Sequence, residues 1–305
     1  MHDDVHDHRL QGDRRALAGA LALIGAFTVV EVVVGYAADS LALLADAGHM
    51  LGDVGSLALA LFAAWLGSRP ATPERSFGYR RAEILAALAN GVVLVAISIW
   101  IVVAAIQRFR DPVEPRGGWV LVVGLVGLAL NLGAAALLHR RGSVSLNVQG
   151  ALRHVLADAL GSLGVIVSGA VVLLTGWSYA DPLVAVGIAA LVLASSWTIL
   201  RDSVGILLES TPRGLDAEEI GRALVEVDGV REVHDLHVWT ITSGFASLSA
   251  HVLVSPDADC HGKRRELERV LEERFDLTHT TLQVDHAGNG ETIPLGTAER
   301  RIGPL

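Results

Sequence analysis

Long apolar runs separated by short polar connectors fill the first two thirds of the chain. A helix needs about 20 mainly apolar residues to cross the hydrocarbon core of a bilayer, and each run is long enough. Connectors such as Asp111-Pro112 and Asp181-Pro182 carry turn residues. The pattern predicts six membrane-spanning helices, at residues 16–38, 40–67, 83–107, 118–138, 149–175 and 182–200.

After about residue 209 the pattern becomes that of a small soluble domain. Asp216, with Glu219 three residues later, is a helix-start signal, and the helix is expected to continue to Asp228 and end at Gly229. Strands are expected at 230–241, 245–254 and 280–285, with a turn at 242–244 and a charged helix at 259–275. The order α-β-β-α-β predicts two layers with the helices on one face of the sheet.

The predicted fold class is therefore a membrane all-α six-helix transmembrane bundle followed by a small cytoplasmic α+β domain. Four regions are expected along the chain. They are a His/Asp-rich N-terminal tail at 1–14, a transmembrane domain at 15–208, a cytoplasmic C-terminal domain at 209–287 and a flexible tail at 288–305.

Arginine placement predicts the orientation, because positively charged connectors remain in the cytoplasm. The connectors after the second and fourth predicted spans carry arginines, as does the N-terminal tail, whereas those after the first and fifth carry none. The connector after the third span, with Arg108, Arg110 and Arg116, disagrees with this pattern. The other connectors and the even number of spans predict that both termini face the cytoplasm.

Composition supports a membrane protein and excludes other classes. Hydrophobic residues make up 51% of the 305 residues, and the mean hydropathy is +0.47. The net charge of -9 argues against nucleic acid as a partner, since phosphate binding needs a basic face. The single cysteine, Cys260, allows no disulfide within one chain. The histidines and aspartates at the start do not form a secretory signal.

A His-x-x-x-Asp pair occurs on two predicted spans, as His49 with Asp53 and His154 with Asp158. The spacing places each pair on one helix face. Both pairs are offset by the same 105 residues (154 − 49 and 158 − 53), which indicates a weak internal repeat. Carboxylates at bilayer depth cost about 2.5–3.5 kcal/mol or more each, so a bound divalent cation would compensate them.

Two imidazoles and two carboxylates match the donor set of tetrahedral zinc, and imidazole disfavours magnesium and calcium. The alternative is that these residues only form hydrogen bonds between the helices. Because the pair occurs on two spans, we prefer the interpretation as metal ligands. Asp46 would either steer the ion or pair within the bundle. Other polar residues in the spans are expected to make contacts between helices: Glu31, Glu83, Asn90 and Asn131.

At these residues the chain resembles the cation diffusion facilitator family, in particular bacterial zinc, cobalt and cadmium resistance exporters. The resemblance extends over nearly the whole chain and includes both His-Asp motifs. It also includes Ser76-Phe-Gly-Tyr-Arg-Arg-Ala-Glu83 and His234-Asp-Leu-His-Val-Trp-Thr-Ile-Thr-Ser-Gly244. It implies proton-coupled metal export, a homodimer and a metallochaperone-like cytoplasmic domain, and the double His-Asp form resembles zinc-type members.

Some members have a histidine-rich connector after the fourth span, whereas the short connector here, residues 140–145, contains no histidine. Some also bind metal after the second span, but residues 67–79 contain no His or Asp, and no such site is expected.

The resemblance also marks a candidate regulatory metal site in the cytoplasmic domain. Its residues match positions that bind metal in some family members: His234, His251, His261 and Asp285. Gln283 stands where other members have histidine, and further candidate ligands are His237, His279 and His286. The alternative is that these are surface histidines of a small packed domain. The tail at 1–14 would either capture metal loosely or be a solvated leader.

The expected function is proton-coupled efflux of a divalent metal by alternating access. Zn²⁺ is the expected substrate, with Cd²⁺ and Co²⁺ as alternatives, and Zn²⁺ is also the candidate regulatory ligand. The expected partners are the lipid bilayer, protons and a second copy of the chain, in a bacterial inner membrane. A membrane-bound metal sensor or scaffold without turnover is the alternative. An enzyme is disfavoured because neither His-Glu-x-x-His nor a Gly-rich phosphate loop occurs.

Overall fold

A computed structural model describes residues 23–140, 146–287 and 301–302, with side chains for 23–136 and 155–287. The chain divides into two compact units. The first, the membrane unit, contains residues 1–62 and 86–200, and the second, the α+β unit, contains residues 63–85 and 201–305. The ends of three long helices therefore group with the α+β unit.

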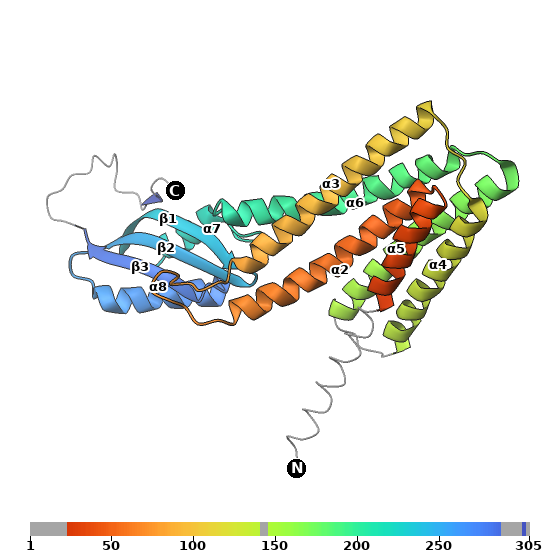
Figure 1. Cartoon of the computed structure of the whole chain (residues 1–305). Coiled ribbons are helices and arrows are strands. Elements are labelled where there is room, and N and C mark those ends of the chain that lie inside the picture. The colour runs from red at the N-terminus through yellow and green to blue at the C-terminus, as the bar shows by residue number, and fades with distance from the viewer. Residues whose placement is uncertain (1–22, 141–145, 288–300, 303–305) are drawn as a thin grey trace, which may run out of the picture. The chain divides into compact units, whose positions relative to one another are not determined.

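The membrane unit is built from apolar helices (Figure 1). Among the described residues, five helices are long and apolar enough to cross a bilayer: α2 (Leu41–Gly67), α3 (Ala82–Arg110), α4 (Gly117–Arg140), α5 (Leu146–Thr175) and α6 (Ala180–Leu207). A shorter apolar helix, Leu23–Ala37, precedes them in the described part of the chain. Five spans and this helix agree with the predicted six-helix bundle.

Large apolar side chains cover the outside of these helices, and small ones fill much of the inside. Leu174, Trp197 and Leu160 are each at least 66% exposed, whereas Ala42, Ala105 and Ala185 are fully buried. Apolar surface on this scale would favour aggregation in water. It suits lipid, where close packing of small residues holds helices together.

The helices α4 and α5 lie side by side because glycines allow their backbones to approach (Figure 1). A Cβ atom added at Gly169 of α5 would lie 2.7 Å from the backbone nitrogen of Leu121 in α4. One added at Gly117 would lie 2.8 Å from the carbonyl oxygen of Gly169. Both distances are shorter than real Cβ contacts, so this crossing excludes any side chain at either position.

Asp181, in the first turn of α6, joins three helices of the membrane unit. Its buried carboxylate accepts hydrogen bonds from the Ser40 hydroxyl and from the backbone N–H of Leu41, both at 2.6 Å, at the start of α2. Arg108 of α3 lies 3.2 Å from the same carboxylate and donates to the carbonyl oxygen of Asp39. Ser40 caps the start of α2 by accepting from the N–H of Leu43, and Asp181, about 140 positions away in sequence, accepts from the N–H groups that Ser40 leaves over.

The α+β unit has the predicted element order. It contains α7 (Ala217–Val225), β1 (Val230–Thr242), β2 (Phe245–Val254), α8 (Cys260–Phe275) and β3 (His279–His286). The strands β1 and β2 are antiparallel and joined at Gly244, whose φ is +71°, whereas β3 lies parallel to β2. Buried leucines and isoleucine of α7 and α8, including Ile220 and Leu267, pack on the valines of one sheet face.

Helix α7 ends earlier than the sequence analysis predicted. Asp216 caps its start as expected, accepting from the N–H groups of Glu218 and Glu219. The helix ends at Val225 instead of Asp228. Val227 is buried in the domain core, so the chain leaves the helix early and turns into β1 through Gly229, whose φ is +81°.

A two-residue strand, β4 (Arg301–Ile302), pairs in parallel with β1, giving the sheet order β3-β2-β1-β4. It lies inside the segment 288–305, for which a flexible tail is predicted, and residues 288–300 and 303–305 lie outside the described residues.

Glu83 makes a contact other than the predicted one between helices. Its carboxylate accepts hydrogen bonds from the hydroxyls of Thr242 and Ser243, at 2.8 and 2.9 Å, at the β1–β2 turn within the α+β unit. By contrast, Asn131 of α4 does bond across helices, donating to the Ser162 hydroxyl of α5.

Candidate metal centre

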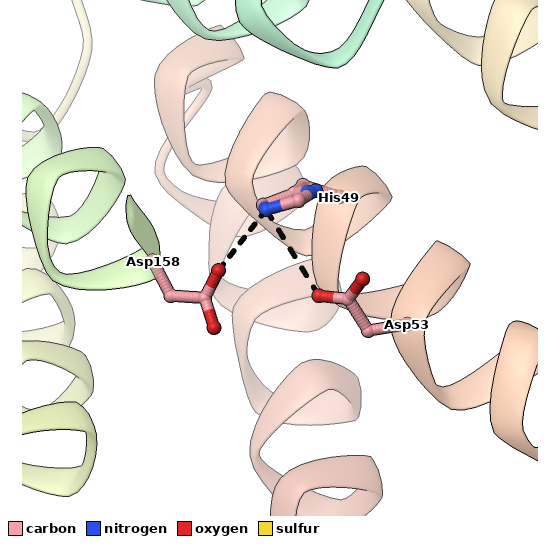
Figure 2. Close-up of side chains that lie close together, drawn as sticks. All are labelled: His49, Asp53 and Asp158. Atoms are coloured by element: carbon pink, nitrogen blue, oxygen red, sulfur yellow. Dashed lines mark hydrogen bonds and ion pairs between the residues drawn. The ribbon is translucent and has the colours of Figure 1, made fainter. Parts of the chain in front are cut away.

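Three of the four predicted transport ligands meet between α2 and α5. The Nε2 atom of His49 lies 3.2 Å from a carboxylate oxygen of Asp158 and 3.9 Å from one of Asp53. Figure 2 shows the imidazole directed towards both carboxylates. One donor atom from each residue lies within 4.8 Å of the others, and among the described residues no other group of three His, Cys, Asp or Glu side chains meets this condition.

These distances are close to those of a metal site. Zinc lies about 2.0–2.2 Å from nitrogen and oxygen ligands, so two ligands of a tetrahedral ion are about 3.3 Å apart. The His49–Asp158 separation of 3.2 Å fits this value, and the 3.9 Å to Asp53 needs a small rotation of one side chain. The three side chains are only 14–32% exposed, so they are partly withdrawn from the surface.

His154 is the fourth predicted ligand. It lies in α5, one helical turn before Asp158, but its side chain lies outside the described residues. Its backbone position is that of a residue on the same helix face as Asp158.

A buried acid adjoins the three ligands. Asp46 is 2% exposed and accepts a hydrogen bond from the Ser162 hydroxyl of α5. It lies in α2, three residues before His49. It also lies against Gly161, where an added Cβ atom would be 2.9 Å from Oδ1. Of the two expectations for Asp46, pairing within the bundle is observed.

The candidate cytoplasmic ligands gather only in part. His234 of β1 and His251 of β2 lie opposite each other on these neighbouring antiparallel strands, with ring centroids 5.4 Å apart. His261 lies in the first turn of α8, and the Asp285 carboxylate accepts a hydrogen bond from Gln283. All four side chains are described, and no three of their donor atoms come within 4.8 Å of one another.

Asp235 is a residue at this cluster that the sequence analysis missed. It has a left-handed backbone, with φ of +53°, at an irregularity of β1 between His234 and His237. This backbone brings its carboxylate to 3.0 Å from Nε2 of His237 and 4.0 Å from Nε2 of His251. A signal was present, because an aspartate that follows a candidate ligand directly is itself a candidate and tolerates left-handed geometry.

Known protein families match both units. Residues 17–208 match the cation efflux transmembrane domain, and residues 212–287 match the cytoplasmic domain of cation efflux proteins. The chain belongs to the cation efflux family. The family that the His-Asp motifs indicated is thereby confirmed.

Several members of the cation efflux family are similar over most of their length. The "cadmium, cobalt and zinc/H(+)-K(+) antiporter" of Bacillus velezensis is 38% identical, over 93% of this chain and 92% of its own. The "metal cation efflux system protein CzcD" of Cupriavidus metallidurans is 41% identical, over 92% and 89%. The "zinc transporter ZitB" of Escherichia coli K12 is 40% identical, over 89% and 87%.

Membership of the cation efflux family confirms the coarser predictions. The chain is an integral membrane transporter of metal cations and not an enzyme. Its soluble part is the cytoplasmic domain of this family.

Proposed function

We propose that this cation efflux protein exports Zn²⁺ from the bacterial cytoplasm in exchange for protons. The ion would bind to His49, Asp53, His154 and Asp158. The convergence of three of these donors between α2 and α5 is the observation that supports the proposal most strongly. Relatives whose names state zinc, cadmium and cobalt support the same class of substrate. Both termini would face the cytoplasm and two copies would form a homodimer.

Proton exchange follows from the chemistry of the donors. A metal ion needs a neutral imidazole and ionised carboxylates, so protons and metal compete for the same atoms. Where protons are abundant, outside the cell, His49 and His154 would take up protons and release the metal. Inside, they would lose protons and bind metal again. Helices α2 and α5 would present the site to each side in turn.

Zinc flux into vesicles that contain the pure protein tests this function. We expect an imposed pH gradient to accelerate zinc flux. We expect Asp158→Asn to reduce the flux by at least about 100-fold, because mutation of residues that only orient the metal ligands already lowers metal affinity or activity by about 10–100-fold. Asp111→Asn, the same change at an exposed position, is the matched control. Flux that survives Asp158→Asn would contradict the ligand set. Zinc binding without any flux would instead favour a sensor or scaffold.

A regulatory metal site in the α+β unit is a second proposal, on the residues His234, His251, His261 and Asp285. The adjacent rings of His234 and His251 support it, as does the nearby carboxylate of Asp235. Because the four donors do not meet within one chain, a shared site in a homodimer suits them best, with the Asp285 carboxylate bridging two ions.

Calorimetric titration of zinc into the full chain tests the regulatory site, with the transport site silenced by Asp158→Asn. Remaining zinc binding should disappear with His251→Ala. It should persist with His279→Ala, a histidine whose ring packs against Phe245. Absence of any binding in the silenced chain would refute this second proposal and leave the transport proposal intact.

A further inference from the structure

The connector between α2 and α3, residues 68–81, is a basic segment in an acidic chain. It contains four arginines and one glutamate, a net charge of +3, whereas the whole chain carries -9. Neither the proposed transport site nor the proposed regulatory site uses any of these residues. Because like charges so close in sequence repel one another, such a segment is typical of a surface that binds a partner of opposite charge.

The lengths of the two helices place this connector at the edge of the bilayer. Helix α2 has 27 residues and α3 has 29, which makes them about 40 and 44 Å long at about 1.5 Å per residue. A bilayer with its headgroup layers is about 40–45 Å thick. Helices of this length that cross it therefore end among the headgroups. Trp65, 55% exposed near the end of α2, agrees with this placement, because tryptophan is enriched at membrane interfaces.

Three of the four arginines stack on aromatic rings. Their guanidinium carbons lie 4.3–4.8 Å from the ring centroids: Arg69 over Trp65, Arg75 over Tyr79 and Arg80 over Phe245. We call these three the stacked arginines. Among the residues whose side chains the structure describes, none of them forms an ion pair with a carboxylate. Their positive charge is therefore not neutralised within the described part of the chain.

The acids nearby are bound to other groups. Glu209 pairs with the fourth arginine, Arg81, at 3.0 Å. Glu83 accepts hydrogen bonds from two hydroxyls of the β1–β2 turn. Glu74, the one acid within the connector, accepts from the side chain of Thr72. The stacked arginines thus keep a surplus of positive charge beside these acids.

Backbone hydrogen bonds within the connector hold the stacked arginines in place. Thr72 and Arg75 exchange two of them, at 3.2 and 3.0 Å, and the N–H of Gly78 donates to the carbonyl oxygen of Arg75 at 2.8 Å. The Arg75 guanidinium also donates to the Tyr79 hydroxyl at 2.7 Å. Groups that are already ordered lose less entropy when they bind a ligand.

A stacked guanidinium group is suited to phosphate. The ring covers one face of the planar group, whereas its five N–H donors lie in the plane and point outwards from its edge. Two of these donors can bind one phosphate group side by side, which gives both charge attraction and fixed geometry. Phosphate is the anionic group that the headgroup layer of a bilayer supplies.

We propose that the stacked arginines bind the phosphate groups of anionic phospholipids. Zwitterionic lipids are weaker ligands, because their ammonium group offsets the charge of the phosphate. The bound headgroups anchor the connector, and with it the ends of α2 and α3, to the membrane surface. This binding is independent of which ion the protein carries.

Native mass spectrometry of the full chain in detergent counts bound lipids and gives their affinities. We expect phosphatidylglycerol to bind at least about tenfold more tightly than phosphatidylcholine, because each arginine near an anionic membrane surface contributes about fivefold. The triple variant Arg69→Gln, Arg75→Gln and Arg80→Gln should reduce this preference to below about threefold. An unchanged preference in the triple variant would overturn the proposal.

Two further variants separate the stacked arginines from net charge alone. The control removes the same charge from exposed arginines of the α+β unit: Arg222→Gln, Arg231→Gln and Arg264→Gln. It should keep the wild-type preference, and an equal loss there would overturn the proposal. Lysine at the three stacked positions keeps the charge but loses the planar donors, so it should weaken the preference at least about threefold. Full preference with lysine would overturn the assignment to stacked guanidinium groups.

Thermal unfolding in vesicles provides a second measurement without zinc. Phosphatidylcholine vesicles are compared with vesicles in which about one third of the lipid is phosphatidylglycerol, since a ligand of the native state raises the unfolding temperature. We expect a rise for the wild type and the control variant, and none for the glutamine triple variant. The same rise in all three would overturn the proposal. Loss of the lipid preference in millimolar inorganic phosphate would show a site for soluble anions and would also overturn it.

Discussion

The nitrogen donor of His49 is what distinguishes this site from one made of oxygen alone. Imidazole suits zinc, whereas carboxylate, carbonyl and water ligands suit manganese and magnesium. In the proposed site, Nε2 of His49, 3.2 Å from a carboxylate oxygen of Asp158, is the nitrogen donor that α2 supplies. In the proposed site, the preference for zinc over harder ions such as manganese therefore depends on the donor atom that position 49 supplies.

We expect His49→Asp to lower the preference for zinc over manganese by about tenfold or more, since it replaces a nitrogen donor with oxygen. Competition between the two ions for uptake into vesicles measures this preference. His279→Asp, the same change at a histidine of the α+β unit, is the control and should leave the preference unchanged. An unaltered preference in His49→Asp would show that His49 does not contact the ion.

The spacing of the His-Asp motif makes part of this site predictable at the residue scale. A four-residue interval places His49 and Asp53 on one face, and the matching interval in α5 indicates which face meets it. Spacing within α2 does not show which residues of the neighbouring helices contact Asp46, so two roles stayed open for this residue. The sequence analysis assigned Glu31 an inter-helix contact, whereas this carboxyl group is fully buried and has no hydrogen-bond partner among the described residues.

At the scale of helices, Gly161 of α5 is where α5 packs against Asp46. A methyl group there would lie 2.9 Å from the carboxylate, so Asp46 or the helix would have to move. We expect Gly161→Ala to cost about 1–3 kcal/mol of stability, as overpacking does, and to reduce zinc flux. Gly187→Ala in α6 is the matched control, because nothing lies within 4 Å of its added atom. The control should be neutral or gain up to about 1 kcal/mol. Unfolding in detergent compares the two variants, and equal stabilities would contradict the packing.

The Asp181 network should hold the ends of α2, α3 and α6 together. Removing its carboxylate takes the ion-pair partner from Arg108, whose side chain is only 17% exposed, and takes the acceptor from the N–H groups of Leu41 and Ala42 at the start of α2. We expect Asp181→Ala to cost about 3–5 kcal/mol in unfolding, as for other broken buried pairs. A double-mutant cycle with Arg108→Met should give a coupling of about 0.5–3 kcal/mol. Additive effects of the two changes would show that the ion pair contributes nothing.

Elements with strong local signals were predictable, whereas contacts distant in sequence were not. Apolar length located the spans, and cap residues such as Asp216 located helix starts. The end of α7 depended on Val227 entering the core, which no local signal marks. Glu83 bonds a turn 159 positions later, and the register that pairs His251 with Gln283 follows from sheet geometry. Convergence of cytoplasmic ligands therefore could not be predicted from the sequence.

For the molecule as a whole, the division into two units separates the proposed transport chemistry from the proposed regulation. The donors at positions 49, 53 and 158 all belong to the membrane unit, as do Glu31 and Asp46. The α+β unit has its own hydrophobic core and its own paired histidines. We therefore expect each unit to bind metal through donors of its own.

A chain that ends at Glu209 tests this independence, since it keeps the whole membrane unit and lacks the matched cytoplasmic domain. We expect its zinc affinity at the transport site to stay within about threefold of that of the full chain, because every described donor remains. Asp158→Asn should abolish that binding in both backgrounds, which identifies the site being titrated. Zinc titration followed by calorimetry gives the affinities, and hydrodynamic size shows whether the full and the truncated chain each form the proposed homodimer. If a folded, truncated chain lost transport-site binding, the cytoplasmic domain would have to support the metal ligands directly.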